Sequence, residues 1–179
     1  GVSKYGSDEE RLRQRSTPAH STLVINGENS SEVWSGFRVG RRALPENIKI
    51  INDKEGETRI IAQHNGFSHL RGHPTHQRDW KLREGKLTIM DTIYGSGTHR
   101  LDVFFHLCVN MKATDLENNC LIIVNNREKQ IGKMTFTGGI INILPSKWFP
   151  AFGVFQRTQC IHVSQTVTLP HQILTKFEW

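Results

Sequence analysis

The stretch RLDVFFHLCV, residues 100–109, decides the fold class because an apolar side chain recurs at every second position. Leu101, Val103 and Phe105 begin this series, and the residues between them are mostly polar. Successive side chains of a β-strand point to opposite faces of its sheet, so the pattern predicts a strand with one buried face. Such a strand needs neighbours that cover its apolar side.

The same period of two recurs along most of the chain. Further strands are expected at residues 21–26, 80–82, 87–93, 121–124, 131–136, 159–169 and 173–179. The turn Glu84-Gly85 between two of these segments predicts a β-hairpin. Residues 8–15 are the one candidate helix, with acidic residues first and basic residues last, but without an apolar stripe they could equally form a solvated loop. The sequence therefore predicts an all-β, antiparallel, multi-stranded β-sandwich with little or no helix.

Length and composition favour one domain over residues 1–179. Hydrophobic residues make up 36% of the 179 and charged residues 22%, which excludes a disordered tail. The longest apolar runs are far shorter than the ~20 residues of a membrane-spanning helix, so no membrane partner is expected.

The net charge of +6 fits either an anionic polymer as partner or ordinary solvated surface charge. The basic residues are scattered, and no ribonucleoprotein motif, zinc finger or basic helix accompanies them, so no nucleic-acid partner is expected. The three cysteines are far apart and form no CxxC pair. They are expected to be buried thiols on strands.

Four of the nine histidines fall in HNGFSHLRGHPTH, residues 64–76. Glycines and a proline interrupt this stretch, which favours a polar loop with one or two hydrogen-bonded histidines over a metal cluster. His99, His106, His162 and His171 lie within or beside expected strands and are expected to be structural or exposed. Motifs of nucleophilic hydrolases, P-loops and HExxH metalloproteases are absent from the sequence.

The order of several short segments is more informative than any single motif. These segments are Tyr5-Gly6, Arg15-Ser16-Thr17, Ala19-His20-Ser21-Thr22, Asn26-Gly27, Glu32-Val33-Trp34, Gly36-Phe37-Arg38-Val39, His64-Asn65-Gly66-Phe67, His76 through Arg78 to Trp80, and Phe149-Pro150-Ala151-Phe152-Gly153. Each match is weak alone, but their order and spacing are fairly specific and cover essentially the whole chain. In them the sequence resembles the carboxyl-terminal β-sheet domain of bacterial heparinase II/III-like polysaccharide lyases.

The resemblance implies a larger enzyme. In that family an amino-terminal α/α toroid packs against the β-domain, and the active cleft lies between them. Residues 1–179 are therefore expected to be a C-terminal fragment whose toroid and first β-strands are missing, and to be inactive alone. The parent is expected to be a periplasmic or secreted bacterial lyase, with its targeting segment outside this chain.

The resemblance also gives His20 a role. In family members with a metal in this domain, the matching histidine shares the ion with an upstream histidine and an upstream aspartate. Two imidazoles and a carboxylate suit zinc, here with a structural more than a catalytic part. Without those partners His20 cannot hold a tight site, and an imidazole satisfied by a backbone carbonyl remains an open alternative.

Such lyases act on uronic acids by β-elimination: the carboxylate is neutralised, a base removes the C5 hydrogen and an acid protonates the leaving oxygen. The principal base and acid are expected outside this chain, and Tyr5 is the one candidate that could reach the cleft, unless it packs on the sheet rim. Arg38, Arg41 and Arg42 are candidate clamps for the acidic polysaccharide, with Trp34 as a stacking platform. The alternative for the arginines is an ordinary exposed edge strand.

Two other functions stay open: a carbohydrate-binding β-sandwich without chemistry of its own, and a degenerate family member in polysaccharide assembly. Exposed aromatics such as Trp34, Phe37 and Trp148 would favour the first of these. Missing upstream strands would leave an open sheet edge near residues 16–26, so an edge-to-edge homodimer is expected.

Overall fold

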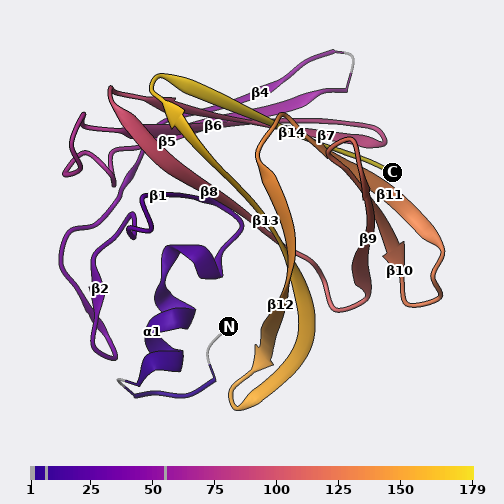
Figure 1. Ribbon diagram of the computed structural model, residues 1–179, viewed down its shortest axis with the longest axis horizontal. Coiled ribbons are helices and arrows are strands. Elements are labelled where there is room, and N and C mark those ends of the chain that lie inside the picture. The colour runs from indigo at the N-terminus through magenta and orange to yellow at the C-terminus, as the bar shows by residue number, and fades with distance from the viewer. Residues whose placement is uncertain (1–2, 7, 55) are drawn as a thin grey trace.

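The computed structural model describes residues 3–6, 8–54 and 56–179, and in them it confirms an antiparallel all-β architecture. A four-stranded sheet has the order β1 (Leu23–Ile25), β8 (Thr98–His106), β13 (Val154–Thr168) and β12 (Ile140–Ala151). An eight-stranded sheet has the order β4 (Pro45–Asn52), β5 (Thr58–His64), β6 (Thr75–Arg83), β7 (Lys86–Tyr94), β14 (His171–Glu178), β11 (Gln130–Phe136), β10 (Cys120–Asn125) and β9 (Met111–Glu117). A separate hairpin joins β2 (Val33–Trp34) to β3 (Arg38–Val39) (Figure 1).

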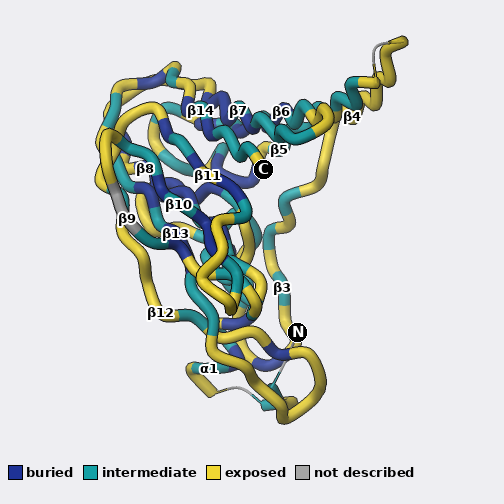
Figure 2. The backbone as a smooth tube through the Cα atoms, turned by 90° about the vertical axis from the view of Figure 1, so that its right-hand side faces the viewer, coloured by how far each residue is buried: buried dark blue, intermediate teal, exposed yellow. Residues whose placement is uncertain are grey.

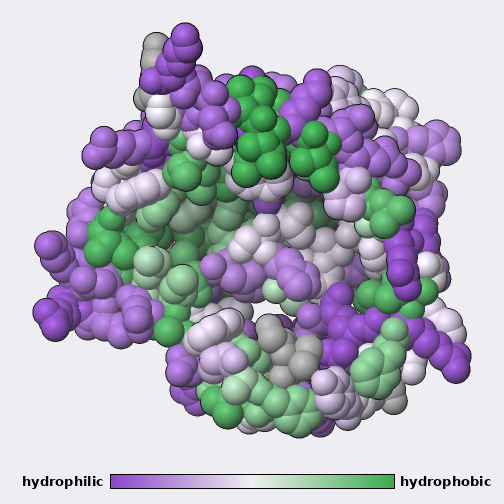
Figure 3. Space-filling view, turned by 180° about the vertical axis from the view of Figure 1, so that it is seen from behind, coloured by the Kyte–Doolittle hydropathy of each residue, from purple (hydrophilic) through white to green (hydrophobic). Residues whose placement is uncertain are grey.

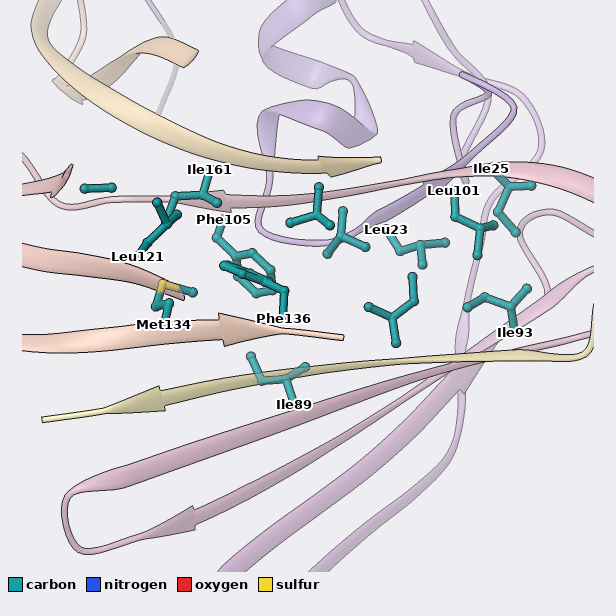
Figure 4. Close-up of a cluster of buried hydrophobic side chains, with 14 of the residues drawn as sticks. Leu23, Ile25, Ile89, Ile93, Leu101, Phe105, Leu121, Met134, Phe136 and Ile161 are labelled. Atoms are coloured by element: carbon teal, nitrogen blue, oxygen red, sulfur yellow. The ribbon is translucent and has the colours of Figure 1, made fainter. Parts of the chain in front are cut away.

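The core lies between the two large sheets. Leu101, Val103 and Phe105 of β8 are buried, as their alternation predicts, and face residues such as Ile89 and Ile93 of β7 (Figure 4). Strand β8 ends at His106, earlier than the alternation indicates, because the chain then turns into β9. The backbone N–H of Met111 closes that turn by donating to the carbonyl of Cys108 at 3.0 Å.

The predicted hairpin at Glu84-Gly85 is confirmed as the β6–β7 pair. Leu82 faces Leu87 across the turn, and Gly85 adopts φ 67°, a left-handed value that glycine reaches without strain. Strand β1 is shorter than residues 21–26, and all three of its residues are buried, so it does not alternate.

Residues Glu9–Arg15 form helix α1, so the interpretation of this segment as a solvated loop is wrong. The Asp8 side chain accepts a hydrogen bond from the Arg11 N–H and caps the helix. Instead of an apolar stripe, α1 buries Arg11 and Gln14, which explains why hydrophobic periodicity gave no helix signal. Among the described residues, no helix is long and apolar enough to cross a membrane.

The cysteines differ from expectation in one respect. All three are free, but only Cys160 is buried, and Cys108 is exposed in the β8–β9 turn. Strand β4 forms one edge of the eight-stranded sheet, is exposed along its whole length and projects away from the body (Figure 2).

Candidate functional site

His20 lines a cavity of about 590 Å³. It follows a 3-10 turn, Thr17–Ala19, and its own N–H donates to the carbonyl of Thr17. The cavity is bounded by α1, this turn, the β8–β9 connection and strands β12 and β13; its lining residues are Arg13, Gln14, Ala19, His20, His106, Leu107, Cys108, Val109, Lys147, Trp148, Phe149 and Thr158. Seen from behind, the surface is hollowed between a lower lobe and the main body (Figure 3).

The charged groups on the cavity wall are positive. Arg13 is paired with Glu10, its Nη2 lying 2.8 Å from the carboxylate, and this hydrogen bond lowers the pKa of Glu10 to about 2. Lys147 extends from β12 with its Nζ 5.2 Å from the centre of the Phe155 ring. A cavity with cations and an adjacent indole, Trp148, suits an acidic sugar better than a neutral or basic ligand.

The imidazoles of His20 and His106 meet at this cavity. Desolvation, with the neighbouring His106, lowers the pKa of His20, so its ring is neutral at pH 7. The two nitrogens of His106 are engaged: Nε2 donates to the Pro18 carbonyl at 2.9 Å and Nδ1 accepts from the Ser146 hydroxyl at 3.2 Å. His106 therefore fixes the turn before His20, a role that alternation could have suggested by placing it on the face opposite Phe105.

A zinc ion would find one suitable ligand here, the neutral imidazole of His20. Among the side chains that the structure describes, no three from His, Cys, Asp or Glu are arranged to hold a metal. Burial raises the pKa of the nearby Cys160 thiol to about 11, which disfavours the thiolate that a metal requires. The described residues thus supply one possible zinc ligand, His20, and do not complete a zinc site.

Tyr5 lies outside the wall of this cavity. Its ring is exposed and packs against Phe37 and Phe152, with centroids 5.7 and 5.1 Å away. Tyr5 precedes the N-terminus of α1 and lies beside the β2–β3 and β12–β13 turns.

The other predicted binding residues gather on and after the β2–β3 hairpin. Arg38 lies over the exposed ring of Trp34, with its guanidinium carbon 4.7 Å from the ring centre. Arg41 donates to the Asn29 carbonyl at 3.4 Å, and Arg42 is exposed in the loop that leads to β4. None of these four side chains lines the cavity at His20.

A second polar cluster is buried between β5, β6 and β7. Arg78 makes a two-pronged ion pair with Asp91, with distances of 2.6 and 2.9 Å, and His76 Nε2 lies 2.6 Å from the same carboxylate. Burial alone would raise the pKa of Asp91, but Arg78 and His76 outweigh it and hold that pKa at about 2. His64 completes the cluster, its Nε2 lying 3.2 Å from His76 Nδ1.

The expectation of a polar loop with one or two hydrogen-bonded histidines in residues 64–76 is only partly met. His64 of β5 and His76 of β6 lie on strands and are hydrogen-bonded to each other, and His73 Nδ1 donates to the Ser68 carbonyl at 2.8 Å. Arg78 also donates from Nη1 to the Ser21 carbonyl at 2.7 Å. The cluster thereby connects the eight-stranded sheet to the residue that follows His20. Sequence reasoning missed Arg78 and Asp91 as its members.

Comparison with known proteins decides the family. The family model described as "Heparinase II/III-like, C-terminal" matches residues 1–176. The chain belongs to this family. No curated protein matches the sequence. The resemblance read from the short segments is therefore confirmed over nearly the whole heparinase II/III-like domain.

Solved structures share the fold of this heparinase II/III-like domain. Heparan sulfate lyase HepC from Pedobacter heparinus is similar with a TM-score of 0.74 and 16% identity, over 99% of this chain and 27% of that one. The heparinase III product of the BT4657 gene has a TM-score of 0.73 and 12% identity, over 99% of this chain and 27% of that one. A crystal structure of heparinase III has a TM-score of 0.60 and 14% identity, over 96% of this chain and 25% of that one. The domain thus spans about a quarter of the length of these proteins.

Proposed function

We propose that this domain forms one wall of a cleft in which a larger lyase cleaves an acidic, uronic-acid polysaccharide by β-elimination. The observation that carries the proposal is the cavity of about 590 Å³ at His20, with Lys147 and Trp148 on its wall. Membership of the heparinase II/III-like family supports a polysaccharide as the substrate class.

The chemistry divides between this chain and the larger protein. β-Elimination requires that the uronate carboxylate be neutralised before the C5 hydrogen can be removed. Lys147, on the wall of the cavity, would neutralise such a carboxylate. The principal base and acid are proposed to come from the α/α toroid, which is the domain's proposed intramolecular partner, with Tyr5 as a further cleft residue.

Zinc in the full-length protein is part of the same proposal. His20 would be one ligand, and the remaining ligands would come from outside the described residues. When bound, the ion would brace the strands around His20. The proposed location of the enzyme is the periplasm or the exterior of a bacterium.

The test is the absorbance of the unsaturated uronate product with heparan sulfate, alginate and glucuronan as substrates. The full-length protein should cleave at least one of them, and residues 1–179 alone should cleave none. Lys147→Ala should raise KM, while Lys129→Ala, in the exposed β10–β11 turn, should not. Turnover by the purified chain alone, or equal KM values for both variants, would contradict this assignment.

A carbohydrate-binding domain without chemistry is the second candidate. The exposure of Trp34, Phe37 and Trp148 favours it, because solvent-exposed rings stack on sugars. Saturable binding by the full-length protein without any unsaturated product would support this candidate, or a degenerate relative in polysaccharide assembly, over the lyase.

A further inference from the structure

A small cavity lies between the two large sheets, at the end of the core where β8 turns into β9. We call it the core cavity, and its volume is about 180 Å³. Side chains from β7, β8, β10, β11 and β14 form most of its wall, among them Leu87, Ile89, Phe105, Ile123, Met134 and Phe177. Ile89, Phe105 and Met134 point into the layer between the sheets (Figure 4). The core cavity is therefore part of the interior of the sandwich.

Thr175 of β14 brings one hydroxyl group to this apolar wall. It is opposed to Ile89 of β7 and to Phe136 of β11, so its side chain lies on the core face of the sheet. Thr175 is 1% exposed, and its Oγ1 has no hydrogen-bond partner among the described residues. A buried hydroxyl without a partner costs free energy that the polar group of a ligand would recover.

The rest of the described wall is uncharged. Arginine, lysine, aspartate and glutamate are absent from the described lining. The Ser21 hydroxyl accepts from the His106 N–H, and both ring nitrogens of His106 have partners outside the core cavity. A charged ligand would lose its hydration here without gaining a counter-charge. A sugar unit would bring several hydroxyl groups, which Thr175 alone could not satisfy.

The volume of the core cavity sets the size of the ligand. An apolar cavity of about 150 Å³ accepts a benzene-sized molecule, and the core cavity is slightly larger. Two methionines, Met111 and Met134, line it. Their unbranched side chains adapt to the shape of a ligand, and their sulfur atoms make favourable contacts with aromatic rings.

We propose that the core cavity binds a small uncharged molecule with a six-membered ring and one hydroxyl group. The ring would pack among the apolar side chains, and the hydroxyl would form a hydrogen bond with Thr175 Oγ1. This ligand class differs from an acidic polysaccharide, so the inference does not depend on the proposed function.

The core cavity also adjoins the cavity at His20. His106, Leu107 and Cys108 line both of them. A ligand in the core cavity would therefore contact the connection that carries His106, whose ring donates to the Pro18 carbonyl and fixes the turn before His20.

The test is methyl NMR of the full-length protein with isotope-labelled methionine, with single Met→Leu substitutions to assign the signals. Met111 and Met134 line the core cavity, whereas Met90, the third methionine of residues 1–179, follows Ile89 on β7 and lies on the opposite face of the sheet. Phenol should shift the signals of Met111 and Met134 saturably through its ring current and leave that of Met90 in place. Benzoate, which is similar in size but charged, should bind at least tenfold more weakly by the signal of Met134.

Thr175→Val tests the role of the hydroxyl. It should weaken phenol binding about fivefold, the value of one neutral hydrogen bond, and should not weaken the binding of toluene, which has no hydroxyl. The variant keeps the shape of the side chain and removes a hydroxyl without a partner, so it is expected to fold. Thr92→Val is the matched control, because Thr92 is also buried but accepts from Gln172 Nε2 and does not line the core cavity. It should leave both affinities unchanged.

The absence of a saturable shift of Met134 with phenol would overturn the proposal. So would equal shifts of all three methionines, equally tight binding of benzoate, or the same phenol affinity for Thr175→Val and the unmodified protein. The titration is repeated with residues 1–179. Shifts that occur there but not in the full-length protein would show that other parts of the protein fill the core cavity, and would also reject the site.

Discussion

Acidification should destabilise the domain through one imidazole, that of His64. Desolvation, with the positive surroundings of His76 and Arg78, lowers the pKa of His64 from its ordinary value near 6.5 to about 4. Its Nδ1 accepts from the Gly66 N–H at 3.2 Å, and its Nε2 faces His76 Nδ1. Protonation of His64 would place a second positive charge beside the Arg78–Asp91 pair, and an added proton on Nδ1 would oppose the Gly66 N–H.

The sign and size of this loss of stability follow from proton linkage to His64. The unfolded chain protonates His64 near pH 6.5 and the folded chain near pH 4, so the unfolded state binds more protons between these values. The contribution of His64 is therefore complete above about pH 6.5 and is lost as the pH falls toward 4. Between pH 7 and pH 4.5 the loss should be about 2 to 3 kcal/mol in the free energy of unfolding.

Urea unfolding followed by tryptophan fluorescence at pH 7, 6, 5 and 4.5 measures this quantity. His64→Gln should cost about 1 kcal/mol at pH 7, through a lost hydrogen bond, yet its stability should fall with pH by about 2 to 3 kcal/mol less than that of the unmodified chain. His69→Gln, at an exposed position of the following turn, should keep the full pH dependence. Parallel pH profiles for the unmodified chain and His64→Gln would refute the reasoning.

Three further outcomes are expected. Asp91→Asn should lower the free energy of unfolding by about 3 to 5 kcal/mol, because it leaves buried Arg78 without a counter-charge. Glu178→Gln, in a solvent-accessible pair with Lys133, should cost much less, and urea melts with equal losses for the two variants would contradict this. His20→Ala should release about one zinc equivalent from the full-length protein and lower its Tm. In residues 1–179, where His20 is exposed, the same substitution should cost less than about 1 kcal/mol. Metal analysis and thermal melts test both expectations, and equal losses of stability in the two proteins, without bound metal, would reject the zinc role. Strand β1 pairs only with β8 among the described residues, so light scattering should show concentration-dependent dimers, and a monomer at high concentration would count against edge pairing.

The Arg78–Asp91 pair shows how far sequence reasoning could have gone. The turn Glu84-Gly85 fixes the register of the β6–β7 hairpin, and counting outward from Leu82 and Leu87 places Arg78 directly opposite Asp91. A cation and a carboxylate at opposed positions of one hairpin are a readable ion-pair signal. The Arg78–Asp91 pair could therefore have been predicted from the sequence, although only the turn and the two strands were predicted from it.

Other parts of the site could not be read in this way. His64 and His76 are opposed across β5 and β6, but the long connection between them does not set a register. The sequence of helix α1 shows only a charge pattern, because the helix packs through polar side chains such as Gln14 rather than through an apolar stripe. The cavity at His20 depends on where α1 and β12 pack, and β12 is distant in sequence. Local patterns predict strands and hairpins, whereas such long-range packing is decided by the whole chain.

The position of His20 in this polar segment is set by the two residues that follow it. The Ser21 carbonyl accepts from Arg78 of β6, while the Ser21 hydroxyl accepts from the His106 N–H of β8 at 3.0 Å. The Thr22 carbonyl accepts from the Phe104 N–H, again at 3.0 Å. Both large sheets thus hold the chain just beyond the imidazole, and Asp91 in turn holds Arg78. Because these anchors are hydrogen bonds to backbone and short side chains, the segment around His20 needs no apolar residues to be rigid, and its ring stays free to face the cavity.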